Sequence, residues 1–291
     1  MAIRESMTMA GDFARTSLYP VRRSARGSRR GRAKPTTEAM AKLNEKYRED
    51  AFADILHTNF GPDDVFLTLT YAAEHMPQTP EEAGRRIANY LRRVAYRCRK
   101  LGLGELMYVY VTERGAKSGR IHHHVFITGL LDRDTLEGIW GLGYANSRRL
   151  DFCEHGIRGL AKYALKSGTI KPEPDEEENE KVGYRTWSGS KNLAKPKKKQ
   201  NDYRIKAKDV AYIDAHPDDY AYIQKLYPGY FVARVETTAR SDEPEDKTPI
   251  PRAHFVTIYL YRADTRLFGW RRMMDKLEKG ERRGSREARG K

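Results

Sequence analysis

Hydrophobic and polar residues alternate in three short runs of the chain. The first is DVFLTLTY (64–71), preceded by the turn-forming GPDD. The second and third, ELMYVYVTE (105–113) and IHHHVFIT (121–128), flank a polar loop with two glycines. A period of two is typical of strands, and two such runs around a glycine-containing loop predict a β-hairpin.

Other stretches place apolar residues at helical spacing. TTEAMAKLNEKYREDAFADILHTNF (36–60) is one, and EHGIRGLAKYALKSG (154–168) is another, with Gly168 at a position typical of a C-terminal cap. Thr79, Pro80 and Glu82 form a capping-box pattern. The apolar stripe after it carries six arginines on its polar side, which predicts an amphipathic helix with a basic outer face.

These patterns predict an α+β fold, in which a central antiparallel sheet of about five strands is flanked by helices. We expect residues 37–170 to form this main domain and residues 201–265 to form a small α+β C-terminal extension. Residues 1–36 are arginine-rich and predict a disordered basic arm, and residues 266–291 predict a basic tail. Between the two folded parts, residues 171–200 run from acidic KPEPDEEENEK to basic AKPKKKQ, which predicts a linker.

The composition indicates a polyanionic partner. Lys and Arg number 55 against 40 Asp and Glu, so the formal net charge is +15. Such an excess favours nucleic acid or an anionic membrane surface. Apolar runs are too short for a membrane span, and the two cysteines, Cys98 and Cys153, favour a reducing compartment. We therefore expect a cytoplasmic protein without a membrane partner.

The three consecutive histidines are not equivalent in a strand. Successive side chains point to opposite faces, so His122 and His124 share one face and His123 points to the other. If the hairpin register pairs Glu113 with His122, the carboxylate joins the two histidines, whereas a shift by one residue would turn Glu113 away. Two histidines and one carboxylate leave coordination positions open, as a catalytic metal requires. We expect His123 to be structural.

A tyrosine and a lysine lie together off the apolar stripe of the helix 154–168. Tyr163 and Lys166 are three residues apart, and therefore neighbours on a helix surface. A tyrosine hydroxyl can form a covalent intermediate with an electrophile, and a nearby ammonium group can stabilise the developing negative charge. Beside a metal that polarises a phosphate, this pair indicates transesterification of a phosphodiester.

In this order, the strand FLTLT, the hairpin Glu-loop-His-x-His and the helix motif YALK resemble the HUH endonucleases. The similarity is greatest to the rolling-circle replication initiators of bacterial plasmids and filamentous phages. The motif HHH departs from the family's His-hydrophobe-His pattern at its middle position. RTWSGSKNLAKPKKK (185–199) also resembles a segment that follows the nuclease core in these initiators.

The resemblance implies a ferredoxin- or RRM-like nuclease core and a mechanism. Mg²⁺ or Mn²⁺ would be held by His122, His124 and Glu113, and Tyr163 would become linked to a 5′-phosphate while a 3′-hydroxyl is freed. Lys166 would orient the tyrosine or neutralise charge. A second tyrosine four residues from Tyr163 is absent, which favours a single-tyrosine enzyme.

The expected substrate is single-stranded or hairpin origin DNA in a bacterial host cell. Lys117, Arg120, Arg158 and Lys162 are candidates for contacts with its phosphate backbone. The chain has no GxxxxGK[ST] motif, so we expect it to depend on a host helicase as well as a host polymerase. Two alternatives remain open: an HUH-type transposase or relaxase, and a non-catalytic basic DNA-binding protein with structural histidines.

Overall fold

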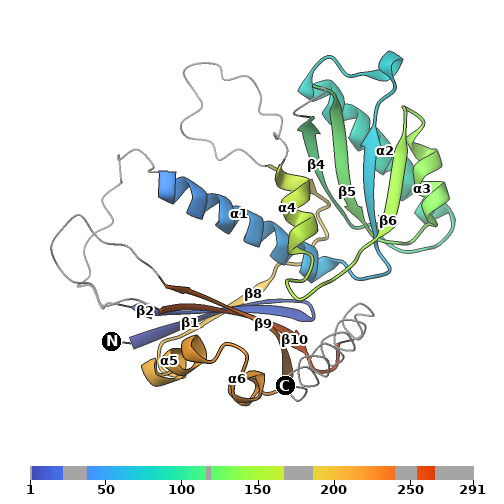
Figure 1. Ribbon diagram of the computed structural model, residues 1–291. Coiled ribbons are helices and arrows are strands. Elements are labelled where there is room, and N and C mark those ends of the chain that lie inside the picture. The colour runs from blue at the N-terminus through green and yellow to red at the C-terminus, as the bar shows by residue number, and fades with distance from the viewer. Residues whose placement is uncertain (1, 22–37, 116–118, 167–185, 240–253, 266–291) are drawn as a thin grey trace, which may run out of the picture. The chain divides into compact units, whose positions relative to one another are not determined.

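A computed structural model describes residues 2–21, 38–115, 119–166, 186–239 and 254–265. The chain divides into two compact units. Unit 1 contains residues 1–58, 153–156 and 195–291, and unit 2 contains residues 59–152 and 157–194. The described parts of both units have antiparallel five-stranded sheets with helices, so the predicted α+β class is confirmed (Figure 1).

Unit 2 is built around a sheet with the strand order β6-β3-β5-β4-β7. Its strands are β3 (Val65–Thr70), β4 (Tyr108–Arg114), β5 (Ile121–Ile127), β6 (Ala145–Arg149) and the short β7 (Ser188–Gly189). Its helices are the 3₁₀ turn η1 (Ala73–His75), α2 (Pro80–Lys100), α3 (Arg133–Trp140) and α4 (Arg158–Lys166). The three strands and the helices predicted from periodicity in this region are therefore present.

One face of this sheet is covered by α2 and α3. Leu67, Leu69 and Val125 of the strands pack against Ile87 and Leu91 of α2, and all five side chains are buried. Helix α2 begins as its sequence predicts, since the Thr79 side chain accepts a hydrogen bond from the Glu82 backbone amide and Pro80 is the first helical residue. The opposite face is left for a different set of side chains.

Unit 1 contains a sheet with the order β8-β1-β2-β10-β9. Its strands are β1 (Ala2–Ala10), β2 (Phe13–Val21), β8 (Lys197–Asn201), β9 (Tyr230–Ala239) and β10 (His254–Arg262). Helix α1 (Glu38–Asn59) lies over one face, and α5 (Ala207–Ala215) and α6 (Tyr220–Leu226) lie over the other (Figure 1). Leu18, Ile213, Ile223 and Ile258 are among the buried residues on the α5–α6 side.

The prediction of a disordered arm is wrong for residues 2–21. These residues form a hairpin whose two-residue turn places Gly11 at a φ of 61°, and Ala10 pairs with Phe13. Polar side chains at buried positions, such as Glu5 and Thr16, weaken the alternation that marks a strand. The apolar partners of this hairpin come from β10 and α5–α6, more than 180 residues later in the chain.

The other predicted boundaries also change. The C-terminal extension is no separate small domain, because β9 and β10 complete the sheet that the N-terminal hairpin begins. Within the predicted linker 171–200, β7 and β8 are strands of two different sheets, whereas residues 171–185 lie outside the described residues. The basic tail 266–291 and residues 22–36 of the predicted arm lie outside them too.

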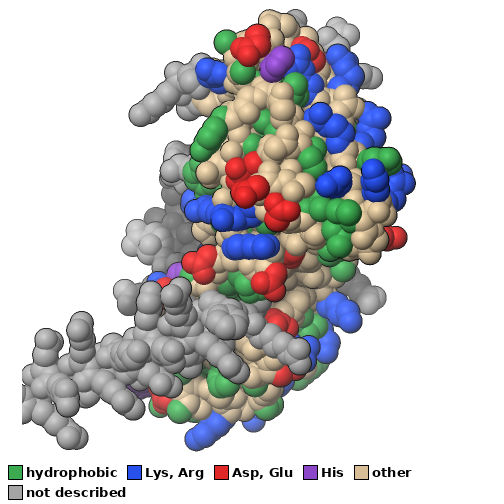
Figure 2. All heavy atoms as spheres, turned by 90° about the vertical axis from the view of Figure 1, so that its right-hand side faces the viewer, with side chains coloured by type: hydrophobic (Ala, Val, Ile, Leu, Met, Phe, Trp, Pro, Cys, Tyr) green, Lys and Arg blue, Asp and Glu red, His purple; other side chains and the backbone are tan. Residues whose placement is uncertain are grey.

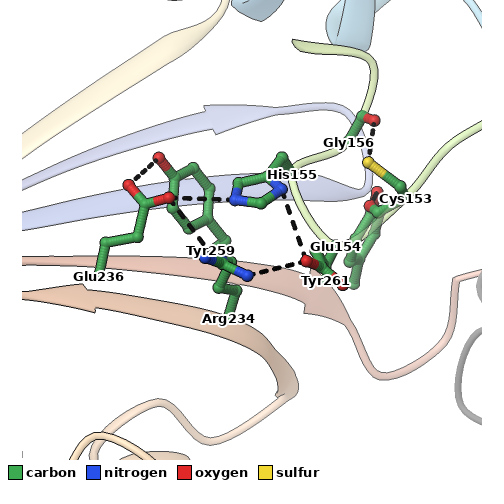
Figure 3. A network of polar contacts seen from close by, with 8 residues as sticks. All are labelled: Cys153, Glu154, His155, Gly156, Arg234, Glu236, Tyr259 and Tyr261. Carbon is green, nitrogen blue, oxygen red and sulfur yellow. Dashed lines mark hydrogen bonds and ion pairs between the residues drawn. The ribbon is translucent and has the colours of Figure 1, made fainter. Parts of the chain in front are cut away.

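The tetrapeptide 153–156, which directly precedes α4, belongs to unit 1 (Figure 3). The Tyr261 hydroxyl donates to the Cys153 carbonyl oxygen at 2.8 Å, and Arg234 pairs with Glu154 at 2.9 Å. His155 Nε2 lies 3.0 Å from Glu236 Oε1. These polar contacts attach the tetrapeptide to strands β9 and β10.

In the described part of the chain, no helix combines the length and the apolar character needed to cross a bilayer.

Candidate active site

The hairpin of β4 and β5 brings Glu113, His122 and His124 together on the sheet face opposite α2. Glu113 pairs with His122, and Val111 pairs with His124, which is the register that the sequence required. One ligand atom of each of the three residues lies within 4.8 Å of the others. Glu113 Oε1 is 3.0 Å from His124 Nε2 and also contacts His122 Nε2.

Hydrogen bonds on the far side of each ring orient the two histidines. His122 Nδ1 is 3.3 Å from the Arg120 carbonyl oxygen, which can only accept. In the neutral ring Nδ1 therefore carries the proton, and the Nε2 lone pair faces Glu113. His124 Nδ1 is 3.3 Å from Thr68 Oγ1, a hydroxyl that can accept in the same way. Both Nε2 atoms thus point toward one carboxylate oxygen.

This donor set fits a divalent cation. Two imidazole nitrogens and one carboxylate oxygen converge from rigid strands, and three ligands leave further coordination positions open. Burial lowers the pKa of His122, but the hydrogen bond and the charge of Glu113 outweigh it, so the pKa of His122 is raised above its usual 6.5. A bound cation would compete with that proton. Among the described residues, this is the one group of three or more such side chains within ligand reach.

His123 lies on the other face of β5, as predicted. Its Nε2 is 2.7 Å from the Tyr71 hydroxyl and its Nδ1 is 2.8 Å from Thr112 Oγ1. Burial lowers the pKa of His123 to about 3. Both ring nitrogens are engaged in hydrogen bonds within the core, which indicates a structural role rather than a metal ligand.

Tyr163 lies on the same face as the three ligand residues. Ala161, Ala164 and Leu165 form the buried side of α4, whereas the Tyr163 side chain is 52% exposed. The ring centroids of Tyr163 and His124 are 5.1 Å apart. Lys166 is the last residue of α4. Its side chain lies outside the described residues, so its pairing with Tyr163 stays a prediction.

Two side chains near the ligands were not predicted from sequence. Phe66 of β3 stacks on the His124 ring with 5.4 Å between centroids, and meets the Tyr163 ring edge-on at 6.4 Å. The Arg148 guanidinium of β6 lies 5.3 Å from the centre of the Phe66 ring. The alternation of FLTLT places Phe66 and Thr68 on one face, but only the pairing of β3 with β5 shows that this is the His124 face.

A cavity of about 640 Å³ opens in unit 2 at the His122 end of the sheet. Thr70, which pairs with His122, is one of its lining residues, and the others are Tyr71, Ala72, Arg120, Gly143 and Tyr144. The Tyr144 side chain is 69% exposed. Tyr144 had no signal in the sequence, because it stands in an irregular stretch between α3 and β6.

The four predicted DNA-contacting residues lie at different places. Arg120 lines the cavity, and its guanidinium donates to the Tyr71 carbonyl oxygen. Arg158 is half-buried and Lys162 is exposed on α4. Lys117 lies outside the described residues.

The fold and the site together define a class: an antiparallel-sheet protein with a two-histidine, one-carboxylate cluster beside a half-exposed tyrosine. Residues 64–168 match the family model for replication-associated proteins of the ORF2 type. This region is roughly a third of the chain, and it contains the ligand cluster and Tyr163. The similarity supports a replication-associated function with DNA as a partner. No curated protein and no solved structure matches the chain significantly.

Proposed function

We propose that this protein is a replication initiator of the HUH endonuclease type. It would nick single-stranded or hairpin-extruded origin DNA and thereby start rolling-circle replication. The observation that carries the proposal is the arrangement of Tyr163, with its ring centroid 5.1 Å from that of His124, on the same sheet face as Glu113 and His122. A match to a replication-associated family model over the same residues supports it.

Tyr163 is the nucleophile in this proposal. Its phenol oxygen forms a bond to the scissile phosphorus, and the bond from phosphorus to the 3′-oxygen breaks. The phenol proton goes to water, and the leaving oxygen takes up a proton to become a 3′-hydroxyl that can prime synthesis. The DNA strand ends as a 5′-phosphotyrosine, so one phosphoester replaces another and no further reactant is required.

Glu113, His122 and His124 would hold the cation, which we propose is Mg²⁺ or Mn²⁺. When bound, such a cation polarises a phosphate oxygen and stabilises the charge that develops on it. The protein's own part is to fix the ligands: the Arg120 carbonyl and Thr68 hydroxyl orient the histidines, and Phe66 packs against His124. Lys166 would orient Tyr163 or neutralise charge on the phenolate.

The strand that carries the scissile phosphate would lie across the exposed side of this sheet face. Arg120, Arg158 and Lys162 are suitable for its phosphates, and Lys117 belongs to the loop that precedes Arg120 in sequence. The half-exposed Tyr163 can reach a phosphate only on an accessible strand, which favours single-stranded DNA or an extruded hairpin. Unwinding and synthesis would then be supplied by a host helicase and polymerase in the bacterial cytoplasm.

Trapping of the covalent intermediate tests the proposal. End-labelled single strands of about 40 nucleotides, tiled over both strands of the DNA that surrounds the gene, would be incubated with protein and Mn²⁺. We expect one tile to give an adduct that survives a denaturing gel, and EDTA to abolish it.

Two matched variants identify the nucleophile. Tyr163→Phe should abolish the adduct and leave DNA binding intact, whereas Tyr203→Phe, which changes a 79% exposed tyrosine of unit 1, should keep it. An adduct with Tyr163→Phe would assign the wrong nucleophile. The absence of any adduct or nick across all tiles with the wild-type protein would favour a non-catalytic DNA-binding protein.

A further inference from the structure

We propose that helix α2 carries a second binding site for single-stranded DNA, separate from the metal-binding face. The site is a groove of about 580 Å³ lined by Arg86, Asn89, Arg92, Arg93, Tyr96 and Leu142, hereafter the α2 groove. The inference extends the proposed function, because this groove would hold a part of the same DNA that the tyrosine does not reach.

Helical spacing creates one wall of the α2 groove. Arg86, Asn89, Arg93 and Tyr96 recur at intervals of three and four residues, so their side chains form a row along α2. From Arg86 to Tyr96 this row is about 15 Å long at 1.5 Å per residue. Leu142, from the segment that precedes β6, lines the groove as well. The length is sufficient for a few nucleotides of an extended strand.

The α2 groove and the ligand cluster lie on opposite sides of the unit 2 sheet. Ile87 and Leu91, on the inner side of α2, pack on Leu67 and Val125. His124 is adjacent to Val125 in β5 and therefore points to the opposite face. A strand bound in the groove would thus not compete with one bound at Tyr163.

The groove carries positive charge that the described carboxylates do not neutralise. Arg86 forms an ion pair with Glu82 at 2.6 Å, but among the described residues no ion pair involves Arg92 or Arg93. Arg92 donates to the Asn89 side-chain oxygen, and Arg93 donates to the Trp140 carbonyl oxygen at 3.1 Å. Figure 2 shows Lys and Arg side chains gathered along the right-hand edge of its upper half. Exposed guanidinium groups in a row are suited to successive phosphates.

An exposed aromatic ring distinguishes single-stranded DNA from a duplex as the occupant. The Tyr96 side chain is 62% exposed, beside the arginines. Basic grooves that also present aromatic rings bind single strands, since unpaired bases stack on the rings while the phosphates meet the cations. Bases in a duplex are already stacked and would offer no face to Tyr96.

Salt-dependent binding tests the α2 groove without cleavage. The probe is a fluorescein-labelled thymidine 20-mer, titrated with the Tyr163→Phe protein in EDTA between about 50 and 300 mM NaCl and followed by anisotropy. Adding Arg92→Ala and Arg93→Ala should weaken binding at least tenfold at the lowest salt. It should also reduce the slope of log K against log salt by about 1.4, since each lost contact with a single strand removes about 0.7.

Two further variants separate the groove from general charge and from stacking. Arg85→Ala with Arg99→Ala removes the same charge from exposed positions of α2 outside the groove, and should change the slope by less than half as much. Tyr96→Ala should weaken binding of the thymidine 20-mer about tenfold with an unchanged slope, because one stacked base is lost. The same change should leave binding of a 20-base-pair duplex unaffected.

Equal effects of the two double variants would overturn the proposal, and so would full affinity of Tyr96→Ala for the single strand. Thermal unfolding of each variant checks that the fold is retained. Failure of this inference is distinguishable from failure of the proposed function. The groove variants in the wild-type Tyr163 background should still form the covalent adduct at saturating protein, whereas a protein without nuclease activity would form none in any background.

Discussion

The three adjacent histidines should respond to alanine substitution in opposite ways. His122 and His124 face Glu113, whereas His123 is buried on the other side of β5. We therefore expect His122→Ala and His124→Ala to remove the stabilisation that Mn²⁺ confers on the protein. His123→Ala should leave the Mn²⁺ effect in place but lower stability in the absence of metal.

The magnitudes follow from the contacts of each ring. His123→Ala leaves the Tyr71 hydroxyl and Thr112 Oγ1 without their imidazole partner in the core. At about 1–3 kcal/mol for each buried group left unsatisfied, the free energy of unfolding should fall by about 2–6 kcal/mol. Mn²⁺ at a hundredfold excess over its Kd should stabilise the wild-type protein by about 2.7 kcal/mol. A tenfold weaker site at the same concentration would give about 1.4 kcal/mol.

The assay is urea unfolding of each variant with Mn²⁺ and with EDTA, followed by tryptophan fluorescence. Trp140 is a suitable reporter, because its ring centroid is 6.0 Å from that of His123. The quantity compared is the difference between the two conditions within one variant, so a general loss of stability cancels. A full Mn²⁺ effect in His124→Ala, or none in a folded His123→Ala protein, would refute the assignment of ligands.

Two predictions concern unit 1. Burial, and secondly the charge of Arg15, lower the pKa of His57 to about 3 from its usual 6.5, so the unfolded chain binds a proton that the folded chain does not. Stability contributed by neutral His57 is therefore complete above pH 6.5 and decreases by about 1.4 kcal/mol per pH unit below it. Urea unfolding at pH 7, 6 and 5 should show a smaller decrease for His57→Phe, and an equal decrease would contradict this reasoning. Gly156→Ala should destabilise by more than about 2 kcal/mol, because φ is +66° and a Cβ would overlap the His57 ring. Gly159→Ala in α4, where a Cβ meets nothing within 4 Å, is the matched control and should change the free energy of unfolding by at most about 1 kcal/mol in the same measurement.

Local patterns predicted unit 2 well because its elements follow one another in sequence and its core is formed between neighbours. The hairpin β4–β5, helix α2 and helix α4 each have a clear period and clear ends. The site followed from the same local rule. Alternation along β5 separates His123 from His122 and His124, and the position of Tyr163 off the apolar stripe of α4 predicts its exposure.

Contributions from distant residues escaped the sequence. Phe66 reaches His124 only because β3 pairs with β5, and Tyr144 reaches the cavity through the segment before β6. Neither pairing has a local signal, since strand order depends on how whole faces are buried against each other.

Unit 1 shows the limit most clearly. Residues 2–21 carry too few large apolar side chains to predict a strand pair on their own, and their core is completed by Ile258, Ile213 and Ile223. The sequence by itself determined which side chains share a face within a strand or helix, because backbone geometry imposes a period of two or of 3.6. Only the tertiary structure decided which faces meet, because burial of apolar area has no direction along the chain and brings together segments from its two ends.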